Sequence, residues 1–191
     1  MGLAKIITLT GATASGKSTV ARELMQIYAC PIITSSTTRS PRADALPGEY
    51  EFLTQDQFAL IVEQEGFAWQ VEFAGHRYGT QAAYIQEALQ AEGVPSLMVL
   101  VPSAVRSLYN FIEAEGQDPT KLVLPFCFET PSREMIVDRM LGRGDSADDT
   151  ASRLKSVKRF EGERISSGID YILVSGLGDV EVPVERIASY F

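Results

Sequence analysis

The sequence predicts a single α/β domain in three layers, a five-stranded parallel sheet with helices on both faces. Short apolar runs alternate with helical patterns along the chain, the order typical of parallel strands joined by helical crossovers. The hydrophobic content of 45% and the charged content of 22% are ordinary for a globular fold. A length of 191 residues is sufficient for one sizeable core.

The five expected strands are short and apolar. They are Lys5–Leu9, Pro31–Ile33, Leu97–Val101, Leu122–Phe128 and Tyr171–Val174. Helical patterns occupy most of the remaining chain. They are Lys17–Tyr28, Thr54–Gln64, Thr80–Gln90, Ser103–Ala114, Pro131–Leu141, Ala147–Glu163 and Val182–Ser189. Pro131 after Thr130 indicates a helix start, and Gly93 and Gly116 indicate helix ends.

The loop after the first strand has the pattern of a phosphate-binding loop. It lies between the apolar run at residues 6–9 and a helical pattern from Val20, which is the context that this motif requires. Backbone N–H groups and the helix start hold a polyphosphate in such a loop, Lys17 reaches the terminal phosphates, and the Ser18 hydroxyl ligates Mg²⁺. The predicted ATP-binding residues are Gly11, Ala12, Thr13, Ala14, Ser15, Gly16, Lys17, Ser18 and Thr19.

Two stretches interrupt the alternation of strands and helices. Residues 34–80 are largely polar, with strand-like pieces at Tyr50–Leu53 and Phe67–Phe73, and residues 142–153 are small, acidic and poor in apolar side chains. We interpret them as an inserted acceptor-binding region and a lid, because a phosphoryl-transfer site must close against water. The core then comprises residues 1–33, 81–141 and 154–191 of one domain.

Charge and composition restrict the partners. A net charge of −8 argues against a nucleic-acid polymer or an anionic membrane, both of which require a basic surface. No apolar run approaches the ~20 residues that span a bilayer, and the N-terminus lacks a signal-peptide pattern. Cys30 and Cys127 suit reduced, buried thiols. We therefore expect a cytoplasmic protein, monomeric or homodimeric, that acts on a small phosphorylated molecule.

Ordered motifs follow the phosphate-binding loop. Ser35–Arg42 places two guanidinium groups, Arg39 and Arg42, three residues apart, which suits bidentate binding of a second phosphate. Next come Tyr-x-Phe at Tyr50, Tyr-Gly-Thr at Tyr78, Arg-x-x-Gly-Arg-Gly at residues 139–144 and Arg-Leu at residues 153–154. Together these blocks resemble guanylate kinase over nearly the whole chain.

The resemblance implies a P-loop kinase with a core, a nucleoside monophosphate (NMP)-binding region and a lid. It implies ATP-dependent phosphoryl transfer to GMP, dGMP or a related nucleotide, modified bases included. Arg39, Arg42, Tyr50 and Tyr78 would hold the acceptor phosphate, with Ser35 and Thr80 near the acceptor base. Lys17, Arg39, Arg139, Arg143 and Arg153 would form the catalytic set, since phosphoryl transfer depends on electrostatic positioning. A phosphate acceptor needs no general base, so His76 is not expected to be catalytic.

The departures from the family pattern concern the acceptor base. Guanylate kinases carry a Glu before Tyr-Gly-Thr that reads the guanine edge, and spacing places Trp69 there. The acidic pair of the third core strand is replaced by Val99 and Val101. Without these carboxylates, strong guanine preference is not expected. Glu72 is the nearby substitute, although strand alternation places it on the face opposite Trp69 unless a bulge intervenes.

Two alternatives remain open from the sequence. A ribose 1,5-bisphosphate phosphokinase also resembles guanylate kinase, and its acceptor has no base to read. A non-catalytic guanylate-kinase-like interaction module binds protein partners, but such modules typically have damaged phosphate-binding loops, whereas Lys17 and Ser18 are present here.

Overall fold

The computed structural model describes residues 4–41, 45–73 and 75–191. Its strands are β1 (Ile6–Thr10), β2 (Ser35–Thr37), β3 (Tyr50–Phe52), β4 (Phe67–Phe73), β5 (His76–Gln81), β6 (Ser96–Val99), β7 (Val123–Phe128) and β8 (Ile172–Val174). Its helices are α1 (Lys17–Tyr28), α2 (Gln55–Glu63), α3 (Ala82–Gln90), α4 (Pro102–Ala114), α5 (Pro119–Leu122), α6 (Arg133–Gly142), α7 (Ala147–Ser166) and α8 (Glu181–Ala188).

The core sheet has four parallel strands in the order β6-β1-β7-β8. The expected fifth strand, Pro31–Ile33, is wrong as a strand, because only an isolated bridge joins Ile32 to Leu97. The Ile33 N–H donates to the Leu97 carbonyl at 2.9 Å, and the Leu97 N–H donates to the Pro31 carbonyl at 2.7 Å. Proline has no N–H to extend the ladder, and the chain joins a second sheet from Ser35 onward.

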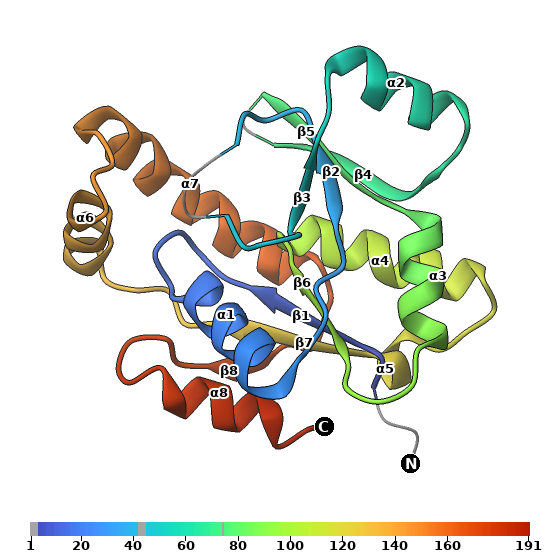
Figure 1. The fold of residues 1–191 in the computed structure, drawn as a ribbon. Helices are drawn as coiled ribbons and strands as arrows, with labels where there is room; N and C mark the ends of the chain where they lie inside the picture. Colours follow the sequence, from blue (N-terminus) through green and yellow to red (C-terminus); the bar gives the residue numbers. More distant parts are fainter. Residues whose placement is uncertain (1–3, 42–44, 74) are drawn as a thin grey trace.

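Both faces of the core sheet are covered, which confirms the three-layer α/β fold. Side chains alternate along β1, so that Ile7 and Leu9 pack towards α1 and α8 while Ile6 packs towards α4. Figure 1 shows α1 and α8 on the near face, with α4 and part of α7 behind the sheet. Burial on two faces explains why the core strands are mostly apolar rather than alternating, with Thr8 and Thr10 as buried polar residues of β1.

The inserted region forms a second sheet, in the order β3-β2-β5-β4. Strand β2 pairs parallel with β3 and antiparallel with β5, and β4 pairs antiparallel with β5. Helix α2 begins with a capping box, in which Thr54 accepts from the Gln57 N–H and the Gln57 side chain accepts from the Thr54 N–H. This sheet stands above the core in Figure 1 and contacts α4 through β4.

Helices α6 and α7 form a projection beside the phosphate-binding loop (Figure 1). The segment expected as a lid, residues 142–153, spans the end of α6, a short turn and the first residues of α7. In the last third of α7, Glu161 accepts a hydrogen bond from the Thr130 hydroxyl, which ties this part of the helix to the segment after β7. Within the described ranges, no helix is long and apolar enough to cross a membrane.

Candidate active site

The phosphate-binding loop connects β1 to α1 and leaves the start of that helix open. Gly16, the N-cap, has a φ of 93°, which favours glycine, and no side chain among the described residues caps the helix. The Gly16 carbonyl oxygen accepts hydrogen bonds from the N–H groups of Thr19 and Val20, so the N–H groups of the residues before Thr19 are not used by it. The N–H groups of the first turn and the positive end of the helix dipole therefore face the loop, as anion binding requires.

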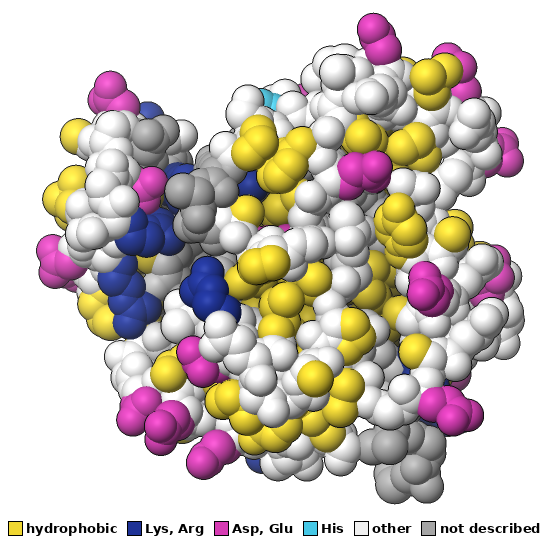
Figure 2. Space-filling model, viewed as in Figure 1, with side chains coloured by type: hydrophobic (Ala, Val, Ile, Leu, Met, Phe, Trp, Pro, Cys, Tyr) yellow, Lys and Arg dark blue, Asp and Glu magenta, His cyan; other side chains and the backbone are white. Residues whose placement is uncertain are grey.

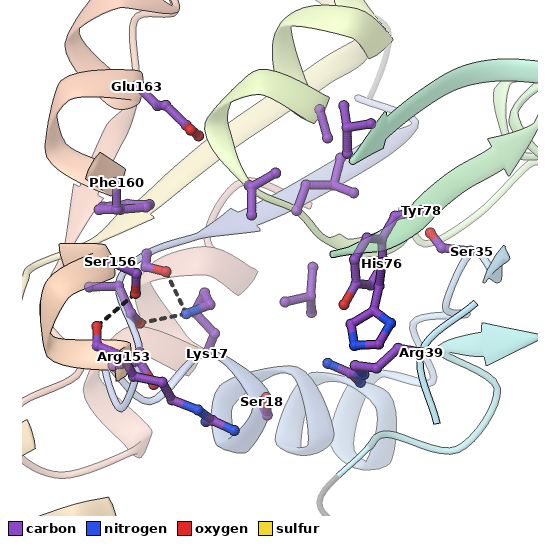
Figure 3. Close-up of a pocket in the computed structure, with 18 of the residues that line it drawn as sticks. Lys17, Ser18, Ser35, Arg39, His76, Tyr78, Arg153, Ser156, Phe160 and Glu163 are labelled. Carbon is purple, nitrogen blue, oxygen red and sulfur yellow. Dashed lines mark hydrogen bonds between the residues drawn. The ribbon is translucent and has the colours of Figure 1, made fainter. Parts of the chain in front are cut away.

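The Lys17 ammonium is folded onto its own loop. Its Nζ donates to the carbonyl oxygens of Gly11 and Ala12, both at 2.7 Å, and to the Ser15 hydroxyl at 3.3 Å (Figure 3). Burial lowers the pKa of Lys17 to about 8, while Cys127 and Glu49 partly oppose that effect. A bound polyphosphate would raise the pKa of Lys17 again, since neighbouring anions favour the charged form.

A second loop, residues 175–178 after β8, packs directly on the phosphate-binding loop. A Cβ added to Gly176 would lie 2.1 Å from the Ser15 carbonyl oxygen, so only glycine fits there. Arg139 joins the two loops, because it donates to the Ala14 carbonyl at 2.7 Å and to the Gly176 carbonyl at 3.4 and 3.3 Å. In this structure Arg139 holds the loop backbone in place.

Two cavities meet at the phosphate-binding loop. The central cavity, about 510 Å³, extends between the second sheet, the end of β6 and α7. The outer cavity, about 350 Å³, lies over α1 and is also lined by Arg139, Gly176, Gly178 and Pro183. Lys17, Ser18 and Arg143 line both. The two spaces therefore share a junction that carries two cationic side chains and a hydroxyl.

One wall of the central cavity presents Arg39 between two tyrosines. The Arg39 guanidinium carbon lies 5.1 Å from the centre of the Tyr50 ring and 6.0 Å from that of Tyr78. Its Nε is buried and has no hydrogen-bond partner among the described residues. Thr37 accepts from the Arg39 N–H and donates to the Arg77 carbonyl, which anchors this turn to β5. Figure 3 shows Arg39 and Lys17 on opposite sides of the open space.

The α6–α7 projection supplies further cations. Arg143 contacts Asp145 at 2.9 Å, and Arg153, which lines the central cavity, lies 4.0 Å from the same carboxylate. Figure 2 shows Lys and Arg side chains gathered where this projection meets the body, while Asp and Glu are scattered over the rest of that face. On this face, the cations thus gather beside the cavities of a chain that is acidic overall.

The structure brings most of the remaining predicted residues to the acceptor side. Ser35, Tyr50, Trp69 and Tyr78 line the central cavity. Thr80 is buried behind Ser35, and the two hydroxyl oxygens lie 2.9 Å apart. His76 lies beside Tyr78 in Figure 3 and lines the same wall. Arg42 lies outside the described residues.

Glu72 does not reach the cavity, which corrects its expected role as an acceptor ligand. The register shift in the β4–β5 pairing lies between Phe67 and Trp69, before the segment in question. Alternation is therefore regular from Trp69 onward, so Trp69 and Val71 face the cavity while Glu72 is exposed on the other side.

Sequence reasoning missed two carboxylates that line the central cavity. Glu49 is buried, and its Oε2 accepts from the Leu46 N–H at 3.0 Å. Burial and the neighbouring Glu49 both raise the pKa of Tyr50 above its ordinary value. Glu163 comes from α7 and pairs with Arg159 at 2.7 Å. In the sequence, the position of Glu49 directly before Tyr50 could have indicated that it lines the cavity. No motif around Glu163 in α7 indicates the same.

Comparison with known proteins decides the family. The family model described as guanylate kinase matches residues 3–110. A guanylate kinase from a Nostoc species is 33% identical, with 96% of this chain and 87% of that protein covered. The chain belongs to the guanylate kinase family. Another relative, from Anaeromyxobacter dehalogenans, is 30% identical over 89% of this chain and 73% of its own length.

The fold comparison agrees with this family. The crystal structure of guanylate kinase from Anaplasma phagocytophilum superposes with a TM-score of 0.69 at 21% identity, covering 99% of this chain and 85% of that one. The expected guanylate kinase fold is therefore confirmed, apart from the number of core strands. Membership of a family of nucleoside monophosphate kinases also confirms the expectation of an enzyme, and it favours a nucleotide kinase over the sugar-phosphate kinase and the non-catalytic module.

Proposed function

We propose that this guanylate kinase family member transfers the γ-phosphoryl group of ATP to a nucleoside 5′-monophosphate, with GMP and dGMP as reference acceptors. The observation that carries the proposal is the junction of the two cavities at Lys17, Ser18 and Arg143. A kinase must bring two anionic substrates to one point while keeping their bodies apart. Two cavities that share cationic walls meet this requirement.

The donor nucleotide fits the outer cavity. The open start of α1 and the N–H groups of the loop would hold the β- and γ-phosphates, and Lys17 would exchange its loop carbonyl partners for phosphate oxygens. Gly176, Gly178, Val180 and Pro183 form the far wall, where the donor base would lie. Arg139 would keep the loop in position while its neighbour Arg143 faces the junction.

Magnesium would be held mainly by the substrates. Among the described residues, no group of three His, Cys, Asp or Glu side chains could hold a metal ion. The Ser18 hydroxyl lines both cavities and is the protein ligand that we propose. Phosphate oxygens and water would complete the shell, which suits an ion that keeps several waters. Bound Mg²⁺ would neutralise charge on the transferred phosphoryl group.

The acceptor phosphate fits the wall formed by Arg39, Tyr50 and Tyr78. The Arg39 Nε, which has no partner among the described residues, and the tyrosine hydroxyls are donors suited to phosphate oxygens. An acceptor phosphate is largely dianionic at neutral pH and attacks without a general base. Transfer then requires that the acceptor phosphate lie in line with the γ-phosphoryl group of ATP. Lys17, Arg143 and Arg153 would stabilise the negative charge on the group in transfer. Cys30 and Cys127 are free and buried, which suits our proposal of a cytoplasmic enzyme.

The test is ADP formation from ATP, Mg²⁺ and GMP or dGMP, with Lys17→Ala as the inactive variant. We expect turnover in the natural chain and a loss of at least about 10²-fold in the variant, since the ammonium acts on developing charge. Lys121→Ala is the matched control, because Lys121 is exposed, lines neither cavity and pairs with Asp118 at 3.2 Å. Absence of nucleotide-dependent ADP formation in the natural chain would refute the proposal.

A further inference from the structure

The far end of the acceptor wall is apolar, and its composition bears on which base it accepts. Beyond Arg39 and the tyrosines, the central cavity is lined by hydrophobic side chains from β4, the end of β6 and the start of α4. They are Trp69, Val71, Val99, Leu100, Val101 and Ala104. These positions include those where the family pattern has a guanine-reading Glu and an acidic pair.

The carboxylates that line the cavity lie elsewhere. Of the described residues, Glu49 and Glu163 are the two acids in its wall. Glu49 is adjacent to Tyr50, on the phosphate side, and already accepts from Leu46. Glu163 stands on α7, across the space from Tyr78 and Ser35 (Figure 3). The registers Val71–Tyr78 and Trp69–Thr80 place Trp69 on the same face of the second sheet as Tyr78.

Trp69 differs from a carboxylate in hydrogen bonding, because its indole N–H can only donate whereas a carboxylate accepts. Its side chain is 6% exposed and packs within the cluster that contains Ile85 and Ala104. Its indole N–H is buried and donates to no acceptor among the described residues. The purine 2-amino group of guanine is itself a donor, so neither this N–H nor the valine side chains can accept from it.

We propose that the acceptor site does not read the 2-amino group, and that it takes purine monophosphates with or without that group, the hypoxanthine nucleotide IMP included. The inference rests on the proposed function and specifies its substrate class. A site with matched polar groups rejects an analogue that lacks one of them by ~10⁴-fold or more, whereas an apolar wall cannot discriminate to that extent. Burying the amine without a partner adds a penalty for GMP that IMP does not bear.

The decisive measurement compares kcat/KM for GMP and IMP with ATP and Mg²⁺, because the two acceptors differ only in the 2-amino group. We expect kcat/KM for IMP to lie within tenfold of that for GMP, or above it. A preference for GMP of more than tenfold overturns the inference. If neither acceptor is phosphorylated, the proposed function fails, and dissociation constants from calorimetry decide the base inference by the same tenfold criterion.

Two variants test Trp69 as the specificity-determining residue. Trp69→Gln introduces a carbonyl that can accept from the 2-amino group, and we expect the GMP-to-IMP ratio of kcat/KM to rise by at least tenfold. Trp69→Phe keeps an apolar ring and removes the N–H, so we expect the ratio to stay within threefold of the natural chain. An unchanged ratio in a folded Trp69→Gln variant would contradict the assignment. If thermal melting shows that this variant is unfolded, the ratio in the natural chain decides.

Discussion

The two ends of the central cavity are built in different ways. At the phosphate-binding loop, backbone contacts between Ser15 and Gly176 leave no space for a side chain, and Lys17 and Arg139 are held by loop carbonyls. At the base end, apolar side chains such as Trp69 and Val101 line the wall. In the proposed function the first end recognises a group common to all nucleotides, so we expect it to tolerate little change. The second end would recognise the base, which varies, and here the residues depart from the expected family pattern.

Of the variants that test this difference between the two ends, Gly176→Ala should lower activity the most. Its Cβ would lie 2.1 Å from the Ser15 carbonyl, so one loop must shift. A displacement of about 1 Å in a phosphoryl-transfer site costs on the order of 10²-fold in rate. We expect kcat/KM for ATP to fall by at least this factor, measured by coupled assay. Gly162→Ala is the control, because a Cβ there meets nothing within 4 Å and Gly162 lines neither cavity, and an equal loss in both variants would contradict the account.

Ser35→Ala tests how the acceptor wall is held. The mutation leaves the Thr80 hydroxyl, which is fully buried, without its partner at 2.9 Å. An unpartnered buried polar group costs about 1–3 kcal/mol, whereas removing both partners is close to neutral. We expect chemical denaturation to show that loss in Ser35→Ala and partial recovery in the double variant Ser35→Ala/Thr80→Val. Additive losses in the double variant would indicate that the two hydroxyls do not interact.

The pH dependence of ATP binding probes the loop end alone. Lys17 has a pKa of about 8 in the empty protein because it is buried, and phosphate favours its charged form. Above pH 8 the lysine must take up a proton to bind ATP. We therefore expect the affinity for ATP to fall by about tenfold for each pH unit above 8, because binding takes up one proton. Calorimetry in buffers of different ionisation enthalpy should detect the proton uptake, and the always-protonated Lys17→Arg variant should lack this pH dependence.

The same shift affects stability with a defined sign. Between pH 8 and 10.5, unfolded Lys17 holds more proton than folded Lys17, because its folded pKa is the lower one. The contribution of Lys17 to the free energy of unfolding of the empty protein therefore rises with pH across this window. Stability that falls relative to the Lys17→Met variant over the same range would contradict the assigned pKa.

The contrast also explains what the sequence could predict. The phosphate-binding loop is a local motif of adjacent residues, so its structure and the start of α1 follow from the sequence. In the second sheet, the strand-like pieces expected at Tyr50–Leu53 and Phe67–Phe73 correspond to β3 and β4. Strand β2 was not predicted, because it has only three residues and pairs with β5 far along the chain. Pro31–Ile33 has the composition of a strand, but only one bridge forms there. Pro31 lacks an N–H, and the chain leaves the core sheet to join the second sheet from Ser35 onward. Glu49 and Glu163 are brought to one cavity only by tertiary packing.

Glu72→Gln should have the smallest effect, and it distinguishes proximity in sequence from position in the fold. Glu72 lies three residues from Trp69, but it is exposed on the other face of β4. Removing its charge should change kcat/KM for GMP and for IMP by less than about twofold, since surface substitutions away from a site are usually within ±0.5 kcal/mol. A selective loss of GMP turnover would mean that β4 shifts its register when the acceptor binds. That result would restore a carboxylate to the base end and remove the difference between the two ends.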